Sequence, residues 1–374
     1  MTAEPIFSNA LPSGNGHLLD MQLVDDAWQV RFISEPRTSP QPLWFNFELS
    51  GLGGSRVRLI WDNVDITLGG KHNLDKLWPV LRADGHDWRR VAEVEVIVTP
   101  DDRRQVVFEQ PEPCDRLQAA FCYPYGPPDL DETLAATGDV WETTVIGLSR
   151  EGREYRRVRL AGRADGRTRP GVYILARQHA GETPGSWVMD GLMRFIAGDS
   201  PEATRFREEM DVWLAPFVDL DGVVNGDYGK DAIPWDFNRA WDAMPMRPEV
   251  HALQEDMKRF AAVTAPRVAL DLHAPVHSTP DLYHHMARDQ RPLAQLKAAL
   301  GYVKLSAERF PELNPDSLPI PTRYGSRWNP MAMFTSWVWD HLDHTVGINY
   351  ETSYQQLAGK VLELDDYREI GERV

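Results

Sequence analysis

The chain has 374 residues, of which 42% are hydrophobic and 10% aromatic, so it is long and apolar enough for a folded protein with a large buried core. Its formal net charge of −16 argues against nucleic-acid and anionic-membrane partners, because both require a basic surface. The sequence shows no basic-then-apolar leader pattern and no run of about 18 apolar residues, so we expect a cytoplasmic protein whose two cysteines are reduced.

Short β-like runs separated by turn residues fill the first third of the chain. The run at 43–52 alternates, with Phe45 and Phe47 on one face and Asn46 and Glu48 on the other, as expected for a strand with one buried face. Several strands at this spacing predict an all-β sandwich domain over residues 1–128. The expected strands cover 17–26, 27–34, 43–52, 56–63, 91–100 and 104–111.

From residue 129 onward the pattern changes to alternating strands and helices. Such alternation predicts an α/β domain over 129–374, with a mostly parallel or mixed sheet covered by helices on both faces. In this arrangement ligands bind beyond the carboxyl ends of the strands. We expect strands at 169–178, 211–219, 265–275 and 344–354, a hairpin at 142–162, and helices at 129–136, 185–198, 248–263 and 290–310.

Chemically reactive side chains occur where these expected strands end. His179 and Glu182 follow the first strand, His273 closes the third, and Glu351 lies in the fourth. Two histidines and a carboxylate are a common ligand set for catalytic zinc, which keeps its fourth position open. Taken alone, the His-x-x-Glu pair also fits a solvent-exposed pair on a turn, so it depends on the rest of the set.

Several sequence motifs of this chain, in their order along it, resemble those of the zinc metallocarboxypeptidases of the funnelin clan, peptidase family M14. Within that family they resemble the cytosolic carboxypeptidase-like branch. The motifs are "RQHAGETPGSWVMDGLM", "APFVDLDGVVNGDYGKD", "PWDFNRAW", "ALDLHAP" and "YETSY", together with "WFNFELSG" and "CYPYGPPDL" in the β-rich part. The resemblance implies a carboxypeptidase-like α/β/α domain after the β-sandwich. It also implies one zinc ion per chain, held by His179, Glu182 and His273.

The resemblance assigns Glu351 as the general base. A carboxylate beside an activated water can accept its proton and return it to the leaving amine. The alternative is an exposed glutamate at a strand end. Asp236 is implied to hold the first zinc histidine from behind, a contact that fixes its tautomer. Asn238 and Arg239 match residues that bind the substrate's terminal carboxylate, for which a guanidinium fork is well suited; the alternative is a surface Asp-Arg pair.

One position departs from the family pattern. In the family an arginine polarises the scissile carbonyl, and an ungapped alignment places Gly229 of this chain at the position of that arginine. Lys230 beside it is a candidate replacement, although an ammonium lacks the guanidinium fork. Arg323 and Arg327 are the other candidates. Tyr324 lies where the family carries a substrate-covering loop, and we expect it to contact the substrate.

The leading hypothesis is therefore a zinc metallocarboxypeptidase that hydrolyses the C-terminal bond of a peptide or a small carboxylate-bearing amide. A zinc amidohydrolase or deacylase acting on an N-acyl amino acid or a modified natural product is the first alternative. A non-catalytic binding protein is the second, although binding alone needs no general base. Residue patterns leave the oligomeric state open.

Overall fold

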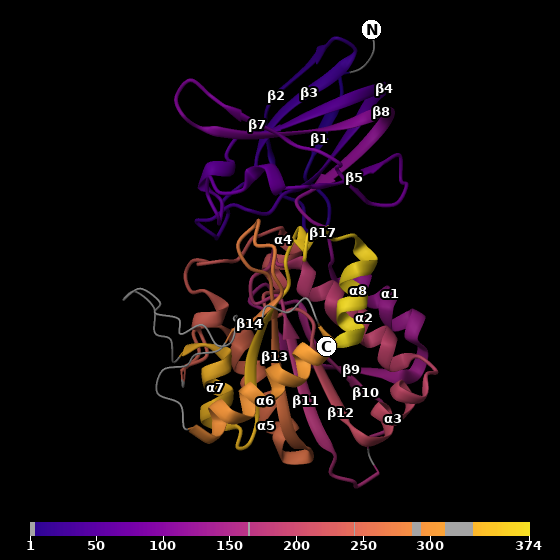
Figure 1. Cartoon of the computed structure of the whole chain (residues 1–374), viewed down its shortest axis with the longest axis vertical. Coiled ribbons are helices and arrows are strands. Elements are labelled where there is room, and N and C mark those ends of the chain that lie inside the picture. The colour runs from indigo at the N-terminus through magenta and orange to yellow at the C-terminus, as the bar shows by residue number, and fades with distance from the viewer. Residues whose placement is uncertain (1–3, 164, 243, 286–292, 311–331) are drawn as a thin grey trace.

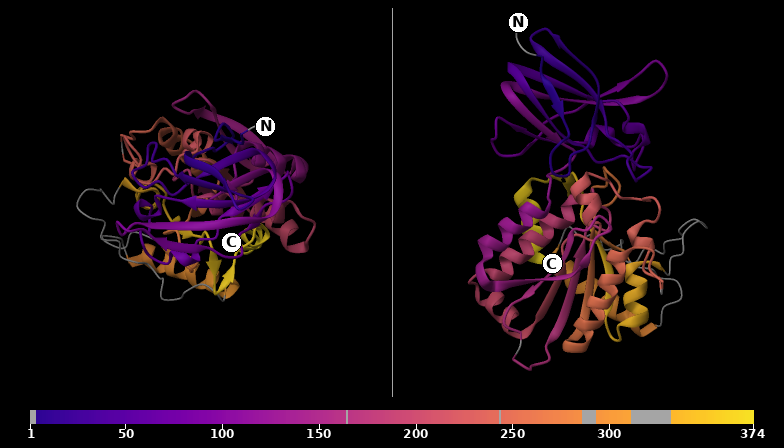
Figure 2. Two further views of the ribbon diagram at one scale, coloured as in Figure 1. Left: turned by 90° about the horizontal axis from the view of Figure 1, so that it is seen from above. Right: turned by 180° about the vertical axis from the view of Figure 1, so that it is seen from behind.

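The computed structural model describes residues 4–163, 165–242, 244–285, 293–310 and 332–374. Two large sheets are stacked along the long axis of the molecule, the N-terminal one above the α/β part (Figure 1). The view from behind shows the same division, with the α-helices in the lower part (Figure 2).

The N-terminal sheet has eight strands in the order β2-β3-β4-β8-β5-β6, with β1 paired to β4 and β7 paired to β8. The strands are β1 (Ile6–Ser8), β2 (His17–Val24), β3 (Ala27–Ile33), β4 (Asn46–Trp61), β5 (Val80–Ala83), β6 (Arg89–Arg90), β7 (Glu95–Val98) and β8 (Arg104–Ala120), with short 3-10 turns at Val64–Ile66 and Leu74–Lys76.

Two long strands make this sheet fold back on itself. The predicted strands at 43–52 and 56–63 are the two halves of β4, which pairs with β8 along its length and is interrupted by register shifts between Ser50 and Val57. The first half of β4 also pairs with β1 and the second half with β3. The ring of Phe32 from β3 packs edge-on against Phe47, 4.7 Å between centroids, so the two halves share one aromatic core.

The second sheet has seven strands in the order β14-β15-β13-β11-β12-β10-β9. The four central strands β15, β13, β11 and β12 run parallel, whereas β14, β10 and β9 are antiparallel to their neighbours, so the sheet is mixed. Its strands are β9 (Trp141–Leu148), β10 (Glu154–Leu160), β11 (Pro170–Ala176), β12 (Asp211–Ala215), β13 (Ala265–His273), β14 (Tyr283–His285) and β15 (Val346–Glu351); β16 (Gln356–Leu357) and β17 (Lys360–Val361) form a separate hairpin.

Helices cover the second sheet, as the alternating pattern predicted. In the views of Figures 1 and 2, α2 and α8 lie on the opposite side of the sheet from α5 and α7. Helices α3, α4, α7 and α8 and strands β1, β5, β6, β14, β16 and β17 were not predicted. The helices are α1 (Pro127–Thr137), α2 (Thr183–Ala197), α3 (Pro201–Glu209), α4 (Leu220–Asn225), α5 (Pro248–Val263), α6 (Leu293–Arg309), α7 (Phe334–His341) and α8 (Leu364–Arg373), with 3-10 turns at Gly138–Val140 and Phe237–Arg239.

None of the helices in these described ranges is long and apolar enough to cross a membrane. Both cysteines, Cys114 and Cys122, are buried free thiols, as predicted.

The N-terminal sheet contacts the loop that follows α4. The Thr38 hydroxyl donates to Asp227 Oδ2 (2.6 Å), the Ser39 hydroxyl donates to the Lys230 carbonyl (2.5 Å), and the Asn15 amide donates to the Gly226 carbonyl (2.7 Å). The N-terminal part of the chain therefore supports segment 226–231, which leads to the candidate site.

Candidate metal and active site

The candidate site lies where three parallel strands end. His179 and Glu182 occupy the turn between β11 and α2, and His273 and Glu351 are the last residues of β13 and β15. His273 and Glu351 are paired in register across the two strands. Because parallel strands place their carboxyl ends at one edge of a sheet, residues far apart in the sequence meet there.

Three side chains form a buried cluster of metal-ligating atoms. Ligand atoms of His179, Glu182 and His273 all lie within 4.8 Å of one another. Glu182 Oε1 is 2.9 Å from His179 Nδ1, and Glu182 Oε2 is 2.7 Å from His273 Nδ1. The three residues are at most 1% exposed. Two imidazole nitrogens and a carboxylate therefore face a common point.

The turn that carries the first two ligands is held by local contacts. Arg177 is buried, adopts a left-handed backbone (φ 64°), and donates from Nε to the Ala180 carbonyl (2.7 Å). The Gly181 N–H donates to the Tyr228 carbonyl (2.9 Å). Glu182 occupies the N-cap position of α2, where the positive end of the helix dipole favours its negative charge.

Each histidine has a carboxylate behind its second ring nitrogen. His179 Nε2 lies 3.3 Å from Asp236 Oδ2, and the Asp236 carboxylate accepts from the backbone N–H groups of Asp231 and Asn238 (both 2.8 Å). His273 Nε2 lies 2.7 Å from Asp271 Oδ2. A carboxylate in this place fixes the ring orientation and the tautomer of a metal-binding histidine.

Sequence reasoning missed Asp271, although a signal was present. Asp271 and His273 are two residues apart on one strand, and side chains at that spacing share a face. Its carboxylate also accepts from the amide of Gln178 (2.5 Å), whose oxygen accepts from the Trp241 indole (2.7 Å). The carboxylate behind His273 is therefore itself held in place.

The electrostatic balance of the site favours a bound cation. Four buried carboxylates, those of Glu182, Asp236, Asp271 and Glu351, lie around the cluster. Nearby cations among the described residues include the ammonium of Lys230, 3.4 Å from Glu182 Oε1, and the guanidinium of Arg239. Burial alone would raise the pKa of Asp236, but His179 first, and then Arg239 and Lys230, hold it below its ordinary value. A divalent ion would balance the remaining negative charge, and nitrogen and oxygen ligands of this kind suit zinc.

Comparison with known proteins identifies the α/β part. A family model of the zinc carboxypeptidases, peptidase family M14, matches residues 129–256. Residues 129–256 are therefore similar to the zinc carboxypeptidases.

Curated relatives and solved structures agree with this assignment. The chain is 26% identical over 292 residues to human cytosolic carboxypeptidase 6, covering 73% of this chain and 57% of the relative. Over 110 residues it is 34% identical to mouse cytosolic carboxypeptidase 1, covering 29% of this chain and 9% of the relative. The chain spans about half the length of the cytosolic carboxypeptidase 6 proteins that it matches.

The fold extends over both parts of solved relatives. A metallo-carboxypeptidase from Burkholderia cenocepacia superposes with a TM-score of 0.81 at 19% identity, covering 99% of this chain and 97% of that structure. A metallo-carboxypeptidase from Pseudomonas aeruginosa, solved in complex with (2-guanidinoethylmercapto)succinic acid, gives 0.75 at 20% identity, covering 98% and 96%. The carboxypeptidase-like fold and the strand-rich N-terminal part are therefore shared.

Gly229 of the carboxypeptidase domain has no room for a side chain. Its φ is 87°, and an added Cβ would lie 2.5 Å from the backbone nitrogen of Ala180 and 3.1 Å from His179 Cα. Segment 228–230 packs directly on the turn that carries the first metal ligand. An arginine at this position is incompatible with that packing, which gives a physical reason for the glycine.

The Lys230 side chain reaches the centre of the site. The ammonium lies 3.4 Å from Glu182 Oε1, and the side chain is 25% exposed. Burial alone would lower the pKa of Lys230, but the carboxylates of Glu182 and Glu351 hold it above its ordinary value, so the side chain stays charged. A fixed positive charge is thus present beside the metal-ligand cluster.

Glu351 is buried, and its Oε2 accepts no hydrogen bond from any described residue. Burial raises its pKa above the usual glutamate value, opposed by the nearby positive groups of His273 and Lys230. A carboxylate with a raised pKa can take up and release a proton nearer neutral pH than an exposed one.

The remaining predicted residues of the carboxypeptidase domain divide into two groups. Asn238 is buried, with Oδ1 accepting from the Phe334 N–H (3.1 Å) and Nδ2 3.2 Å from His273 Nε2, and Arg239 NH1 donates to the Asn238 carbonyl (2.7 Å). Both lie on the 3-10 turn after Asp236, next to the cluster. Tyr324, Arg323 and Arg327 lie outside the described residues.

Proposed function

We propose that this chain is a zinc-dependent metallocarboxypeptidase that hydrolyses the C-terminal bond of a peptide or a peptide-like amide. The observation that supports it best is the buried His179, Glu182 and His273 cluster with Glu351 on the neighbouring strand end. Its residues 1–128 and 129–374 would form the β-sandwich and the catalytic domain. The naming of its relatives as cytosolic supports a cytoplasmic location.

Zinc held by His179, Glu182 and His273 would supply Lewis acidity, which makes a water molecule acidic enough to act as a nucleophile near neutral pH and polarises the scissile carbonyl. Glu351 would accept the proton from the attacking water and deliver it to the leaving nitrogen. Its unpartnered Oε2 and its raised pKa both suit this exchange.

Other residues would orient and charge-stabilise the substrate. Asp236 and Asp271 would hold the two histidine rings with their Nδ1 atoms toward the metal. Asn238 and Arg239 would bind the free carboxylate of the substrate. Lys230 would stabilise the negative charge that develops on the carbonyl oxygen. It would thereby replace the arginine of the family, whose position is occupied by Gly229 in this chain.

Metal analysis combined with one substitution tests the proposal. Protein purified without added zinc should carry one zinc per chain and release C-terminal residues from a peptide panel that varies only in its last residue. Glu351→Gln should retain zinc and lose at least about 100-fold in kcat, since general-base catalysis contributes roughly 10²–10⁴. Glu255→Gln, at a half-exposed glutamate of α5 that pairs with Lys258, is the control. A chain that binds no zinc would refute the proposal.

The glycine at 229 keeps one alternative open. If a lysine stabilises the oxyanion less well than an arginine, a less demanding amide becomes a plausible substrate, and an N-acyl amino acid also presents a free carboxylate. Parallel assay of dipeptides and N-acyl amino acids on the zinc-loaded protein distinguishes the two. Turnover confined to the acyl amino acids would assign an amidohydrolase.

A further inference from the structure

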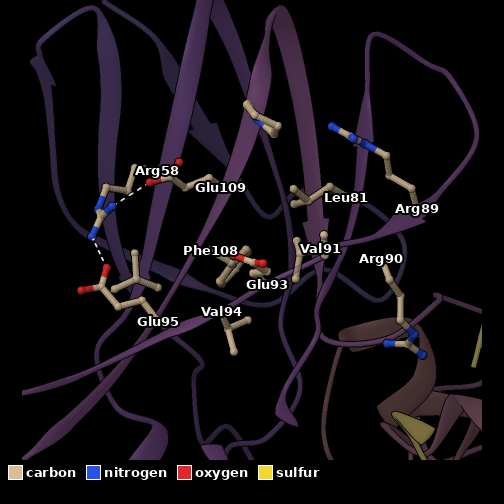
Figure 3. A pocket seen from close by; sticks show the side chains of 13 residues that line it. Arg58, Leu81, Arg89, Arg90, Val91, Glu93, Val94, Glu95, Phe108 and Glu109 are labelled. Atoms are coloured by element: carbon tan, nitrogen blue, oxygen red, sulfur yellow. Dashed lines mark hydrogen bonds and ion pairs between the residues drawn. The ribbon is translucent and has the colours of Figure 1, made fainter. Parts of the chain in front are cut away.

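The N-terminal part of the chain (residues 1–128, here called the β-domain) supplies one charged side chain, that of Arg90, to the inside of the C-terminal part (residues 129–374, here called the carboxypeptidase domain). Arg90 is one of the residues that line a pocket of about 390 Å³ in the β-domain. Figure 3 shows its side chain turned away from Leu81 and Val91 toward the yellow C-terminal segment. The neighbouring Arg58 and Arg89 pair with carboxylates of their own domain. Within the described ranges no carboxylate pairs with Arg90, although it is only 8% exposed.

Neutral groups satisfy the Arg90 guanidinium instead. It spans the two domains and uses all three of its nitrogens. Nε donates to the Leu362 carbonyl (2.5 Å), NH1 to the Trp78 carbonyl (2.7 Å) and to Gln355 Oε1 (3.1 Å), and NH2 to the Tyr354 carbonyl (2.7 Å) and to the Tyr367 hydroxyl (2.8 Å).

Burial of the Arg90 guanidinium between two domains carries a large desolvation free energy. Removing a guanidinium from water without a carboxylate partner costs several kcal/mol unless its N–H groups are satisfied. Ordinary apolar contacts would join the domains without that cost. Three of the five hydrogen-bond partners of Arg90, Tyr354, Gln355 and Leu362, instead lie in one short segment, residues 354–362, which follows the strand that carries Glu351.

That segment follows Glu351 closely along the chain. Tyr354 and Gln355 follow Glu351 by three and four residues, and the intervening chain is tied on its other side by the Thr352 N–H, which donates to the His273 carbonyl (2.9 Å). No described residue donates a hydrogen bond to Glu351 Oε2. The position of this carboxylate therefore depends on its backbone, which pairs with β13 and β14 and continues into the segment that Arg90 contacts.

We propose that Arg90 is a positioning residue for Glu351, through which the β-domain takes part in catalysis by the neighbouring domain. The proposal rests on the proposed function in one respect, the role of Glu351 as general base. Loss of the Arg90 contacts would let segment 352–355 move and displace the carboxylate, and misplacement of a catalytic group by about 1 Å can cost on the order of 100-fold in rate.

Kinetics of two adjacent substitutions provide the first test. Arg90→Met should lower kcat by about tenfold or more, with KM changed less than about twofold and with the zinc content of the wild type. Arg89→Met is the matched control, because Arg89 is on the same strand but its side chain donates hydrogen bonds to Gln110 and Glu112, both in the N-terminal part. Its kcat should equal that of the wild type. Equal kcat for a folded, zinc-loaded Arg90→Met would overturn the proposal.

Arg90→Lys serves if the methionine variant does not fold. A lysine keeps the charge but has three donors on one nitrogen in place of the fork, so it cannot reach Leu362, Gln355 and Tyr354 together. Its kcat should also fall, but by less than that of Arg90→Met. A loss that is only proportional to lost zinc or to the unfolded fraction would indicate a structural role and contradict positioning.

Hydrogen exchange tests the physical link without using activity. The backbone amides of 352–356 should exchange faster in Arg90→Lys than in Arg89→Met, while those of β13 remain protected. Unchanged exchange would overturn the proposal even in an active enzyme. If the wild type turns over no substrate, the proposed function fails, whereas faster exchange in the variant would still show that Arg90 orders the segment.

Discussion

At the level of single residues, the site depends on carboxylates that are never exposed to solvent. Glu182 has no exposed surface, and both of its oxygens face histidine nitrogens. Asp236 and Asp271 continue this pattern on the far side of each ring. Each histidine therefore has one nitrogen toward Glu182 and the other near an aspartate, at 2.7 Å for His273 and 3.3 Å for His179.

Substitution of Asp271 tests the pattern. Asp271→Asn should weaken zinc binding by about 10- to 100-fold, because the amide cannot compensate the charge of the histidine or select its tautomer as a carboxylate does. Competition with a chromophoric chelator measures the affinity directly. Asp256→Asn, a buried aspartate that accepts from the Tyr173 hydroxyl elsewhere in the domain, is the control. Equal zinc affinity in the two variants would contradict a role for Asp271 in metal binding.

Gly229 gives a second prediction at this scale. Gly229→Ala should lower the melting temperature and the zinc affinity, because the added Cβ meets the backbone of the His179 turn and the left-handed backbone is strained, together about 2 to 4 kcal/mol. Gly152→Ala separates the two effects, since its φ is 81° and nothing lies within 4 Å of its added Cβ. We expect it to cost only the backbone strain, about 1 to 2 kcal/mol, and to leave zinc affinity unchanged.

At the level of elements, the helix α4 begins with a buried carboxylate that is sensitive to pH. Asp219 accepts from the Gly222 N–H (2.9 Å) at the start of the helix. Burial raises the pKa of Asp219 from 3.8 to about 7; the Gly222 N–H and Arg247 oppose the rise, and Asp227 and Glu249 add to it. Since the folded protein holds this proton more tightly than the unfolded chain, the stabilisation is complete below about pH 4 and is lost as the pH rises through 7.

Asp219→Asn should remove this pH dependence. The asparagine oxygen still accepts from Gly222, but no charge has to be buried at high pH. The melting temperature of the variant should therefore be close to that of the wild type at pH 5 and higher than it at pH 8. The same difference at both pH values would show that Asp219 does not titrate between them.

Much of this element structure was predictable from periodicity. Strand β11, helix α5 and strand β13 were predicted close to their observed bounds because each is a regular apolar pattern with clear end signals. The two halves of β4 were predicted as separate strands because Gly51, Gly53 and Gly54 indicate a turn, whereas the chain bends there without leaving the sheet. Helices α3 and α8 were missed because charged residues interrupt their short apolar stripes.

The predicted site residues divide along similar lines. His179, Glu182, His273 and Glu351 carry their chemistry in their residue types and follow readable strands, so their proximity could be anticipated. Asp271 could be recognised from the sequence only as the residue two positions before His273 on the same strand. Arg90 could not be found from the sequence, because its meaning depends on an interface between segments more than 260 residues apart.

At the level of the whole molecule, metal binding and stability are coupled. A divalent ion at the cluster would balance buried negative charge and bind only the folded chain, which stabilises it by about 4 kcal/mol at a free concentration of a thousand times its Kd. Removal of zinc with a chelator should therefore lower the melting temperature by several degrees, and re-addition should restore it. His273→Ala should show no such response. An equal response in both proteins would place the stabilising metal elsewhere.

The pairing of β13 with β15 has a consequence for how errors in folding would affect activity. His273 and Glu351 are register partners, and the same ladder aligns Leu270 with Ile348 in the core. Adjacent residues of a strand point to opposite faces, so a slip by one position would turn Glu351 away from His273 and expose core side chains at once. Chains that misalign these strands would be both inactive and poorly packed, and a proteolytic system that removes unstable chains would thereby also remove those with a misassembled site.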